Sequence, residues 1–192
     1  MKFVNTTCIE LDRELSDLDR LAVDFTTILH NYTPYVIVSG YVAILLGRSR
    51  ASEDIDIIIP KIDYATFQTL ADELKANGFY CLNTEENKDI YEYLTDNLAV
   101  RFARHNTVIP NIEMKWAKNS IDELALKKTL TIKFLKGTLY TSHLELQIAF
   151  KEIVLRSPKD MEDARHMRNI AEKYLDKKLI KQYKEMLRDL YR

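Results

Sequence analysis

The pattern of apolar and polar positions predicts that helices and strands alternate along most of the chain. Apolar residues recur every three or four positions over residues 9–30, which is typical of a helix, whereas the short β-branched runs at 35–38 and 54–59 are typical of buried strands. The remaining predicted elements are, in chain order, helix 41–46, a helix after its cap Asp63, strand 79–82, a helix near 85–95, strands 98–103 and 108–116, helix 121–128 capped by Ser120, a hairpin that starts with strand 129–135, and helices 143–155, 158–172 and 176–191.

These elements fall into two parts. Residues 1–141 mix helices and strands, which predicts an α/β (α+β) core with a small mixed sheet flanked by helices. Residues 142–192 are predicted to form a C-terminal helical region. Because no Pro- or Ser-rich linker separates the two parts, we expect the helical region to pack on the core.

The composition is typical of an ordinary globular chain and argues against disordered, secreted and membrane classes. Hydrophobic residues make up 46% and charged residues 30% of the 192 positions, with only four glycines and four prolines. Cys8 and Cys81 lack metal-ligand spacing and form no disulfide framework, so we expect a cytoplasmic location. No apolar run approaches the roughly 20 residues of a membrane span, and charges come too early for a signal peptide.

The net charge of −1 conceals an asymmetry along the sequence. Residues 1–100 contain 8 Lys and Arg against 17 Asp and Glu, whereas residues 101–192 contain 20 against 12. This pattern is compatible with a metal-binding part beside a polyanion-binding part. The alternative, which charge alone favours, is that both halves simply have solvated charged faces.

The strand predicted over residues 54–59 carries two acids on one face. Side chains alternate along a strand, so Ile55, Ile57 and Ile59 point into a core and Asp54 and Asp56 point the other way, roughly 6–7 Å apart. Two such carboxylates could hold Mg²⁺, a hard cation that also binds phosphate oxygens. The alternative is a half-exposed strand whose outer face happens to be acidic.

Strand 35–38 ends at Ser39-Gly40, which opens a short helix. A turn of small residues at a helix N-terminus offers free backbone N–H groups to a phosphate, and glycine allows a close approach. Alone, this turn is better explained as an ordinary strand-to-helix connection.

A third acid lies on another predicted strand. In residues 111–116, Ile112, Met114 and Trp116 face one way while Glu113 and Lys115 face the other, so Glu113 could join the aspartate pair. A plain Glu–Lys surface face is the competing interpretation.

The helical tail places Lys151 in the middle of an apolar helical stripe, followed by Asp160 and Asp163 one turn apart. A lysine there is usually paired or reaches the surface, but it could also deliver an amine to a triphosphate. The chain contains neither a G-x-G-x-x-G nor a P-loop motif, and no G-x-S-x-G turn, while its four histidines are scattered without ligand spacing.

Taken together, these motifs resemble the nucleotidyltransferase superfamily, whose members have a DNA polymerase β-like fold. The resemblance rests on the segments VIVSG (36–40), RASEDID (50–56) and IEMK (112–115). It departs from the common pattern in having Ser39 before Gly40 and Glu113 in place of Asp. The tail segment KEIVLRSPKDMED (151–163) resembles an element of the AbiEii-type toxin-like subgroup.

The resemblance implies transfer of a nucleoside monophosphate from an NTP to an acceptor, with Asp54, Asp56 and Glu113 as catalytic residues and ligands of Mg²⁺ or Mn²⁺. Glu113 would complete the metal site nearest the acceptor and help to deprotonate it. The residues implied in nucleotide binding are Ser39, Gly40, Arg50, Ser52, Lys151 and Asp160.

Several questions stay open at the level of sequence. The acceptor could be tRNA, a protein or a small molecule, the NTP is unspecified, and an antitoxin partner is compatible with the toxin-like subgroup. The main alternative is a catalytically inactive member that binds nucleotide, nucleic acid or a protein. A third hypothesis is a structural or interaction domain whose acids merely lie on the surface. The presence of all three acids, Asp54, Asp56 and Glu113, favours an enzyme over the inactive member.

Overall fold

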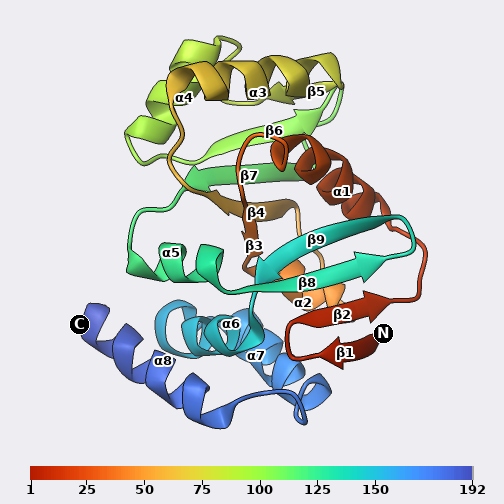
Figure 1. Cartoon of the computed structure of the whole chain (residues 1–192), viewed down its shortest axis with the longest axis vertical. Coiled ribbons are helices and arrows are strands. Elements are labelled where there is room, and N and C mark those ends of the chain that lie inside the picture. Colours follow the sequence, from red (N-terminus) through yellow and green to blue (C-terminus); the bar gives the residue numbers. More distant parts are fainter. Residues whose placement is uncertain (192) are drawn as a thin grey trace.

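The computed structural model describes residues 1–191 and contains one mixed sheet of nine strands within that range (Figure 1). The strands are β1 (Lys2–Asn5), β2 (Cys8–Leu11), β3 (Val36–Val38), β4 (Asp54–Ile59), β5 (Phe79–Cys81), β6 (Val100–Arg104), β7 (Asn111–Trp116), β8 (Thr129–Phe134) and β9 (Gly137–Ser142). Their order across the sheet is β1-β2-β8-β9-β3-β4-β7-β6-β5. The pairs β2–β8, β9–β3 and β4–β7 are parallel, and the others are antiparallel.

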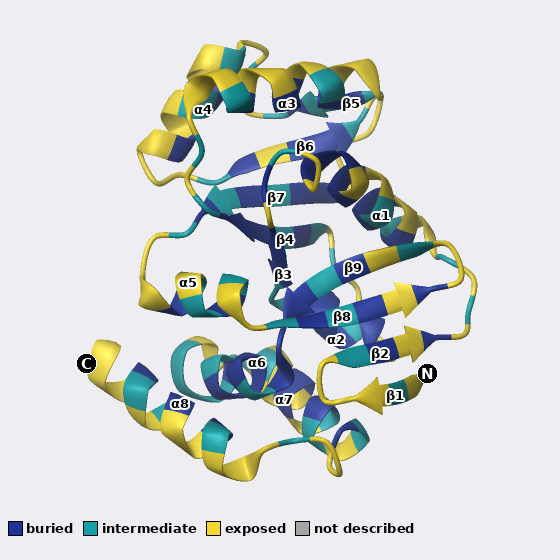
Figure 2. Ribbon diagram, viewed as in Figure 1, coloured by how far each residue is buried: buried dark blue, intermediate teal, exposed yellow. Residues whose placement is uncertain are grey.

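Helices cover both faces of this sheet. They are α1 (Asp17–Leu29), α2 (Gly40–Leu45), α3 (Tyr64–Ala76), α4 (Asn87–Thr95), α5 (Ser120–Lys127), α6 (Leu144–Phe150), the π-helical turn η1 (Lys151–Leu155), α7 (Pro158–Ile170) and α8 (Lys177–Leu190). The larger core packs α1, α3 and α4 against the sheet, and a smaller core packs α5, α6 and α8 against its other face. Figure 2 shows the buried residues concentrated on the central strands between these layers.

The alternation in β4 decides which face of the sheet is available to a site. Ile55, Ile57 and Ile59 are at most 1% exposed and belong to the larger core, whereas Ile58 belongs to the smaller core on the opposite face. Asp54 and Asp56 share that opposite face with Ile58 and are only partly buried. The predicted alternation is therefore confirmed.

The predicted helix over residues 9–30 is wrong in its first part. Residues 8–11 form β2, which pairs in parallel with β8 and antiparallel with β1, so Ile9 and Leu11 are buried by strand alternation. Helix α1 starts only after Ser16, whose hydroxyl accepts a hydrogen bond from the Asp19 N–H while the Asp19 carboxylate accepts one from the Ser16 N–H. This capping box fixes the helix start, and the leucine spacing upstream of it was coincidental.

The predicted helix over residues 143–155 changes character part-way. Regular α-helix ends at Phe150, and residues 151–155 form a π-helical turn that ends at Arg156 in the left-handed conformation (φ 57°). The extra residue per turn rotates the side chains that follow relative to those of α6. The other predicted elements are present with shifted ends, for example β6 and β7, which begin at Val100 and Asn111. In residues 1–191 the structure has no helix long and apolar enough to cross a membrane.

The cap of α5 is one residue earlier than predicted. The side chain of Asn119, not Ser120, accepts hydrogen bonds from the N–H groups of Ile121 (2.9 Å) and Asp122 (3.0 Å). Both residues are good capping types, so the sequence alone did not distinguish them.

We expect Asn119→Ala to lower the free energy of unfolding by about 1 kcal/mol, because two N–H groups at the start of α5 lose their acceptor. Urea denaturation followed by circular dichroism measures this loss. Ser120→Ala is the matched control and should change stability by less than about 0.5 kcal/mol. Equal losses in the two variants would contradict the assignment of the cap.

Candidate functional site

The three predicted acids lie on two neighbouring strands. Strand β4 pairs in parallel with β7, and the register places Asp56 directly beside Glu113 and Asp54 beside Asn111. Residues side by side in a sheet point to the same face, so the three carboxylates occupy one face of the sheet. The structure thus brings together acids that lie 57 positions apart in the sequence, from Asp56 to Glu113.

The carboxylates interact electrostatically. Burial and the negative charge of Asp54 raise the pKa of Asp56 to about 6, with a smaller contribution from Glu113. A hydrogen bond from Ser39 and the nearby charge of Lys115 act in the opposite direction. An acid whose pKa is raised by burial and by neighbouring acids is typical of a functional site.

Glu113 also has a cationic partner. Arg101 lies opposite Glu113 in the antiparallel β6–β7 pair, and its Nε and Nη2 atoms donate hydrogen bonds to one carboxylate oxygen at 3.0 and 2.7 Å. This ion pair raises the pKa of Arg101. In the described part of the chain, no group of three or more His, Cys, Asp or Glu side chains is placed ready to hold a metal ion.

The Ser39-Gly40 turn lies next to the aspartates. Ser39 has a φ of 66°, an unusual conformation for a residue with a side chain; its hydroxyl does not cap α2 and instead lowers the pKa of Asp56. A Cβ on Gly40 would lie 2.8 Å from the guanidinium of Arg50, so a side chain at this position would displace the arginine. The turn therefore lies between the Asp56 carboxylate and the guanidinium of Arg50.

Ser52 and Arg50 come from the loop that precedes β4. The Ser52 hydroxyl donates to the backbone carbonyl of Asp54 (3.1 Å), which helps to fix the start of the strand. The Arg50 guanidinium is 9% exposed and pairs with the buried Asp163 of α7 at 2.5 Å. The loop is thereby tied to the C-terminal helices.

Asp163 is the centre of a buried ion-pair group, which we call the Asp163 cluster; its members are Arg48, Arg50, Lys151, Asp160, Glu162 and Asp163. Lys151 is 1% exposed at its side chain and donates to Asp160 and Asp163, both at 3.0 Å. Burial alone would raise the pKa of Asp163, but its hydrogen bonds and the charges of Lys151 and both arginines hold it below the usual value. Two predicted nucleotide contacts, Lys151 and Asp160, are thus hydrogen bonded to protein groups.

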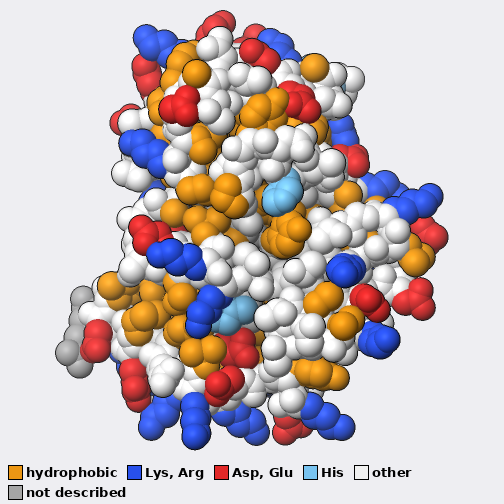
Figure 3. Space-filling model, viewed as in Figure 1, with side chains coloured by type: hydrophobic (Ala, Val, Ile, Leu, Met, Phe, Trp, Pro, Cys, Tyr) orange, Lys and Arg blue, Asp and Glu red, His pale blue; other side chains and the backbone are white. Residues whose placement is uncertain are grey.

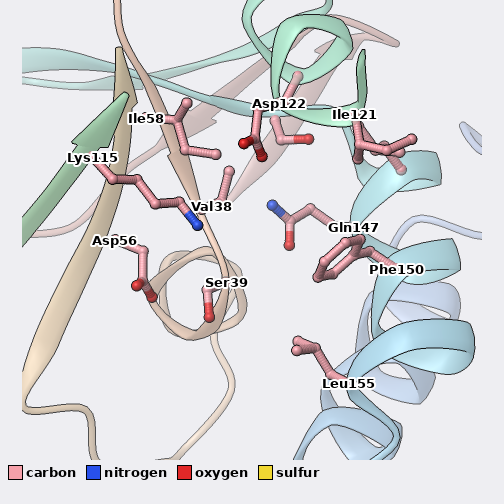
Figure 4. Close-up of a pocket in the computed structure, with 13 residues that line it drawn as sticks. Val38, Ser39, Asp56, Ile58, Lys115, Ile121, Asp122, Gln147, Phe150 and Leu155 are labelled. Atoms are coloured by element: carbon pink, nitrogen blue, oxygen red, sulfur yellow. The ribbon is translucent and has the colours of Figure 1, made fainter. Parts of the chain in front are cut away.

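A cavity of about 220 Å³ opens beside the aspartates (Figure 4). It lies between β3, β4 and β7 on one side and α5, α6 and η1 on the other. Lys115, Ser142 and Gln147 line it, and none of them was a predicted site residue. For Lys115 the strand alternation with Glu113 was a usable signal, whereas Ser142 and Gln147 reach the cavity only through the packing of β9 and α6.

The comparisons with known proteins bear on the fold. No family model matches the sequence, and no curated protein matches it significantly. Among solved structures, the chain is similar to an antigenic nucleotidyltransferase-like protein from Paracoccidioides brasiliensis, with a TM-score of 0.50 and 14% sequence identity; the match covers 88% of this chain and 85% of that one. The chain has a nucleotidyltransferase-like fold. The predicted fold class, a mixed sheet flanked by helices with helices at the C-terminal end, is confirmed.

We expect Asp163→Asn to lower the free energy of unfolding by roughly 3–5 kcal/mol, because it leaves Arg50 and Lys151 buried without their shared counter-charge. Urea denaturation measures the loss. Glu162→Gln is the control: Glu162 is 56% exposed and among residues 1–191 its one ion pair is with Arg48, so its loss should stay below about 1 kcal/mol. Similar values for the two variants would show that the cluster contributes no more than a surface ion pair.

The raised pKa of Asp56 predicts a pH-dependent effect. Its pKa of about 6 lies above the ordinary 3.8, so the folded chain binds this proton more tightly than the unfolded chain and loses stability as pH rises through that interval. Without divalent metal, Asp56→Asn should therefore be more stable than the wild type above pH 6, by at most about 3 kcal/mol, and the gain should vanish below pH 4.

Denaturation of both proteins in EDTA between pH 4 and 8 tests this expectation. Asp54→Asn serves as a second variant, because removal of the Asp54 charge should reduce the pH dependence without abolishing it. A stability difference between Asp56→Asn and wild type that is constant over this pH range would contradict the assignment.

Proposed function

We propose that the chain is a metal-dependent nucleotidyltransferase, which moves a nucleoside monophosphate from an NTP to an acceptor. The observation that carries the proposal is the register of β4 and β7, which places Asp56 beside Glu113 with Asp54 on the same face. The nucleotidyltransferase-like fold and the adjacent cavity support it.

The donor chemistry of the acids suits a divalent cation, although in residues 1–191 the three carboxylates are not gathered closely enough to hold one as they stand. Asp54, Asp56 and Glu113 supply only carboxylate oxygens, the ligand type that Mg²⁺ prefers, and Mn²⁺ accepts the same type. Mutual repulsion contributes to the raised pKa of Asp56, and a cation there would offset it. When bound, the cation would supply charge neutralisation for the phosphates and a template for in-line displacement.

In the reaction, an acceptor hydroxyl oxygen forms a bond to the α-phosphorus, the bond from that phosphorus to the bridging oxygen breaks, and pyrophosphate leaves. Glu113, whose side chain is 22% exposed, accepts the hydroxyl proton once its pairing with Arg101 loosens. Ser39, the Gly40 backbone and Lys115 hold the phosphates. Ser52 fixes the start of β4 beneath Asp54.

The remaining predicted contacts have a more indirect role in this proposal. Arg50 reaches the Ser39-Gly40 turn from the Asp163 cluster and adds positive charge behind it. Lys151 and Asp160 remain predictions as nucleotide contacts. In the Asp163 cluster, Lys151 pairs with both Asp160 and Asp163, and Asp163 in turn pairs with Arg50. These contacts hold the loop before β4 in place.

The finer proposal is that the chain is an AbiEii-type toxin-like member, with an antitoxin as a possible partner. Its support is the resemblance of residues 151–163, four of whose charged residues, Lys151, Asp160, Glu162 and Asp163, belong to the Asp163 cluster. For the acceptor, tRNA, a protein and a small molecule remain candidates. Basic and acidic side chains are intermixed on the face in Figure 3, so that face does not favour a polyanion.

A second candidate function is nucleotide binding without catalysis. The Arg101–Glu113 ion pair favours it, because it neutralises the third acid and leaves Asp54 and Asp56 as the two acids without an ion pair among residues 1–191. The two candidates differ in whether label moves from an NTP to another molecule.

The test is incubation with each of the four NTPs labelled at the α-phosphate, with Mg²⁺ or Mn²⁺, in the presence of total RNA, protein or small-molecule fractions. We expect label in one fraction, and Asp54→Asn and Asp56→Ala should lower the rate at least about 100-fold, because they remove charge that stabilises the transferring phosphate.

Asp17→Asn is the matched control, because Asp17 is 95% exposed on α1 and should have no effect on transfer. Transfer that survives Asp54→Asn would exclude this site. Tight metal-dependent NTP binding with no label in any fraction would favour the second candidate.

A further inference from the structure

The ion pair between Arg101 and Glu113 uses only part of what each side chain offers. The Nε and Nη2 atoms of Arg101 both donate to one carboxylate oxygen, Oε2, at 3.0 and 2.7 Å. In residues 1–191, neither the Nη1 atom of Arg101 nor the second oxygen of Glu113 takes part in the pair. Arginine binds a carboxylate most strongly when two N–H groups meet two oxygens, so this pair lacks the strong bidentate geometry.

The pair is also open to solvent. The side chain of Arg101 is 54% exposed and that of Glu113 is 22% exposed. Ion pairs at exposed positions contribute little net stability, because water screens the charges and two long side chains lose conformational freedom. Glu113 can therefore exchange Arg101 for a more highly charged partner at little cost.

The place of the pair in the sheet decides where the Glu113 carboxylate lies. Strand β7 runs between β4 and β6, so Glu113 has Asp56 on one side and Arg101 on the other (Figure 1). The hydrogen bonds draw its carboxylate toward β6 and away from the aspartates on β4. This agrees with the finding that, in the part of the chain the structure describes, no three acidic side chains are grouped closely enough for a metal ion.

Arg101 also acts as a counter-charge for the other two acids. Its hydrogen bond with Glu113 has the largest effect in raising the pKa of Arg101, and the charges of Glu113, Asp54 and Asp56 raise it further. The guanidinium is therefore within the electric field of all three carboxylates. A divalent cation at these acids would interact with them more strongly than a single guanidinium does, because it carries twice the charge.

The row of acids has an unsatisfied oxygen at its Asp54 end. Asn111, which pairs with Asp54 in the sheet, is 7% exposed, and its Nδ2 atom donates to the Val108 carbonyl at 3.2 Å. Its Oδ1 atom is buried and has no hydrogen-bond partner. A buried acceptor without a donor costs free energy, and a cation or its hydration water would offset that cost. Observations at both ends of the row thus indicate that it suits a further positive group.

We propose that Arg101 is a positioning residue for Glu113. It holds the carboxylate on the β6 side of the row, and Glu113 exchanges Arg101 for a divalent cation held at Asp54 and Asp56. The strength of the Arg101–Glu113 pair then sets the affinity of the row for that cation. The inference rests on the proposed function for the role of the cation, but it concerns binding and is tested without turnover. The alternative is a cross-strand ion pair that only stabilises the sheet.

The test is titration of the full chain with Mn²⁺ alone, without nucleotide, followed by the electron paramagnetic resonance signal of the free ion. Arg101→Gln should bind Mn²⁺ at least about threefold more tightly than the wild type, because the side chain that competes for Glu113 loses its charge. Arg20→Gln is the matched control: Arg20 is 56% exposed on α1 and pairs with Asp17, so its loss should leave the affinity unchanged.

A double-mutant cycle separates positioning from simple repulsion between Arg101 and the cation. The cycle compares Arg101→Gln with the wild type, and the double variant Arg101→Gln/Glu113→Gln with Glu113→Gln alone. If Arg101 acts through Glu113, its removal raises the Mn²⁺ affinity only while Glu113 is present. A gain of the same size in both backgrounds would mean that Arg101 merely repels the cation, and it would overturn the inference.

Two other results would also overturn it. An unchanged Mn²⁺ affinity in Arg101→Gln, with or without a lower unfolding midpoint, would leave sheet stabilisation as the only role of the pair. Failure of both the wild type and Arg101→Gln to bind Mn²⁺ would exclude the exchange. The proposed function fails in a different way: Mn²⁺ binding would respond to both substitutions as expected while labelled NTPs transferred nothing.

Discussion

The parallel pairing of β4 with β7 is the constraint on which the site depends. It places Asp56 beside Glu113. On the other side of β7, the antiparallel pairing with β6 places Arg101 beside Glu113. A shift of one residue would turn Glu113 and Lys115 into the core and bring Ile112 and Met114 out. Since Ile112 and Met114 are fully buried, the hydrophobic core itself holds the register that gathers the acids.

A second constraint acts on the loop before β4. This loop has few apolar residues of its own, and it is held by the pairing of Arg48 and Arg50 with Asp163. Arg50 in turn lies against Gly40, so a single carboxylate on α7 positions both the loop and the turn that opens α2. The C-terminal helices thus complete the site without placing an acid in it.

The acidic strand, its alternation and the small-residue turn could be predicted because they follow from local periodicity. The third acid could be predicted as well, since Glu113 alternates with apolar neighbours in the same manner. The start of the chain was misassigned, because Leu11, Leu15 and Leu18 have helical spacing while the capping box at Ser16 and Asp19 decides where the helix begins. Local spacing does not reveal that β8, over 100 residues later, pairs with residues 8–11.

The tail shows the same limit. Its charged residues were recognised, but whether Lys151 faces a nucleotide or Asp163 depends on how α7 folds back on η1, and the sequence pattern of either helix alone does not contain that information. Likewise, Gln147 and Ser142 are unremarkable in sequence. Burial leaves the Ser142 hydroxyl without a partner, and the Gln147 side chain lines the cavity; only tertiary packing creates these properties.

The helix α6 and its π-helical continuation connect these two regions. Gln147 lies on the cavity side of α6, whereas Lys151, four residues later and at the start of η1, is buried in the Asp163 cluster. In a regular α-helix, residues four apart share a face, so Gln147 and Lys151 lie along one side of this segment. One side of this helix therefore contributes Gln147 to the cavity wall and Lys151 to the Asp163 cluster, which holds Arg50 against Gly40. A ligand that moved this helix would act on both the cavity and the turn beside Asp56.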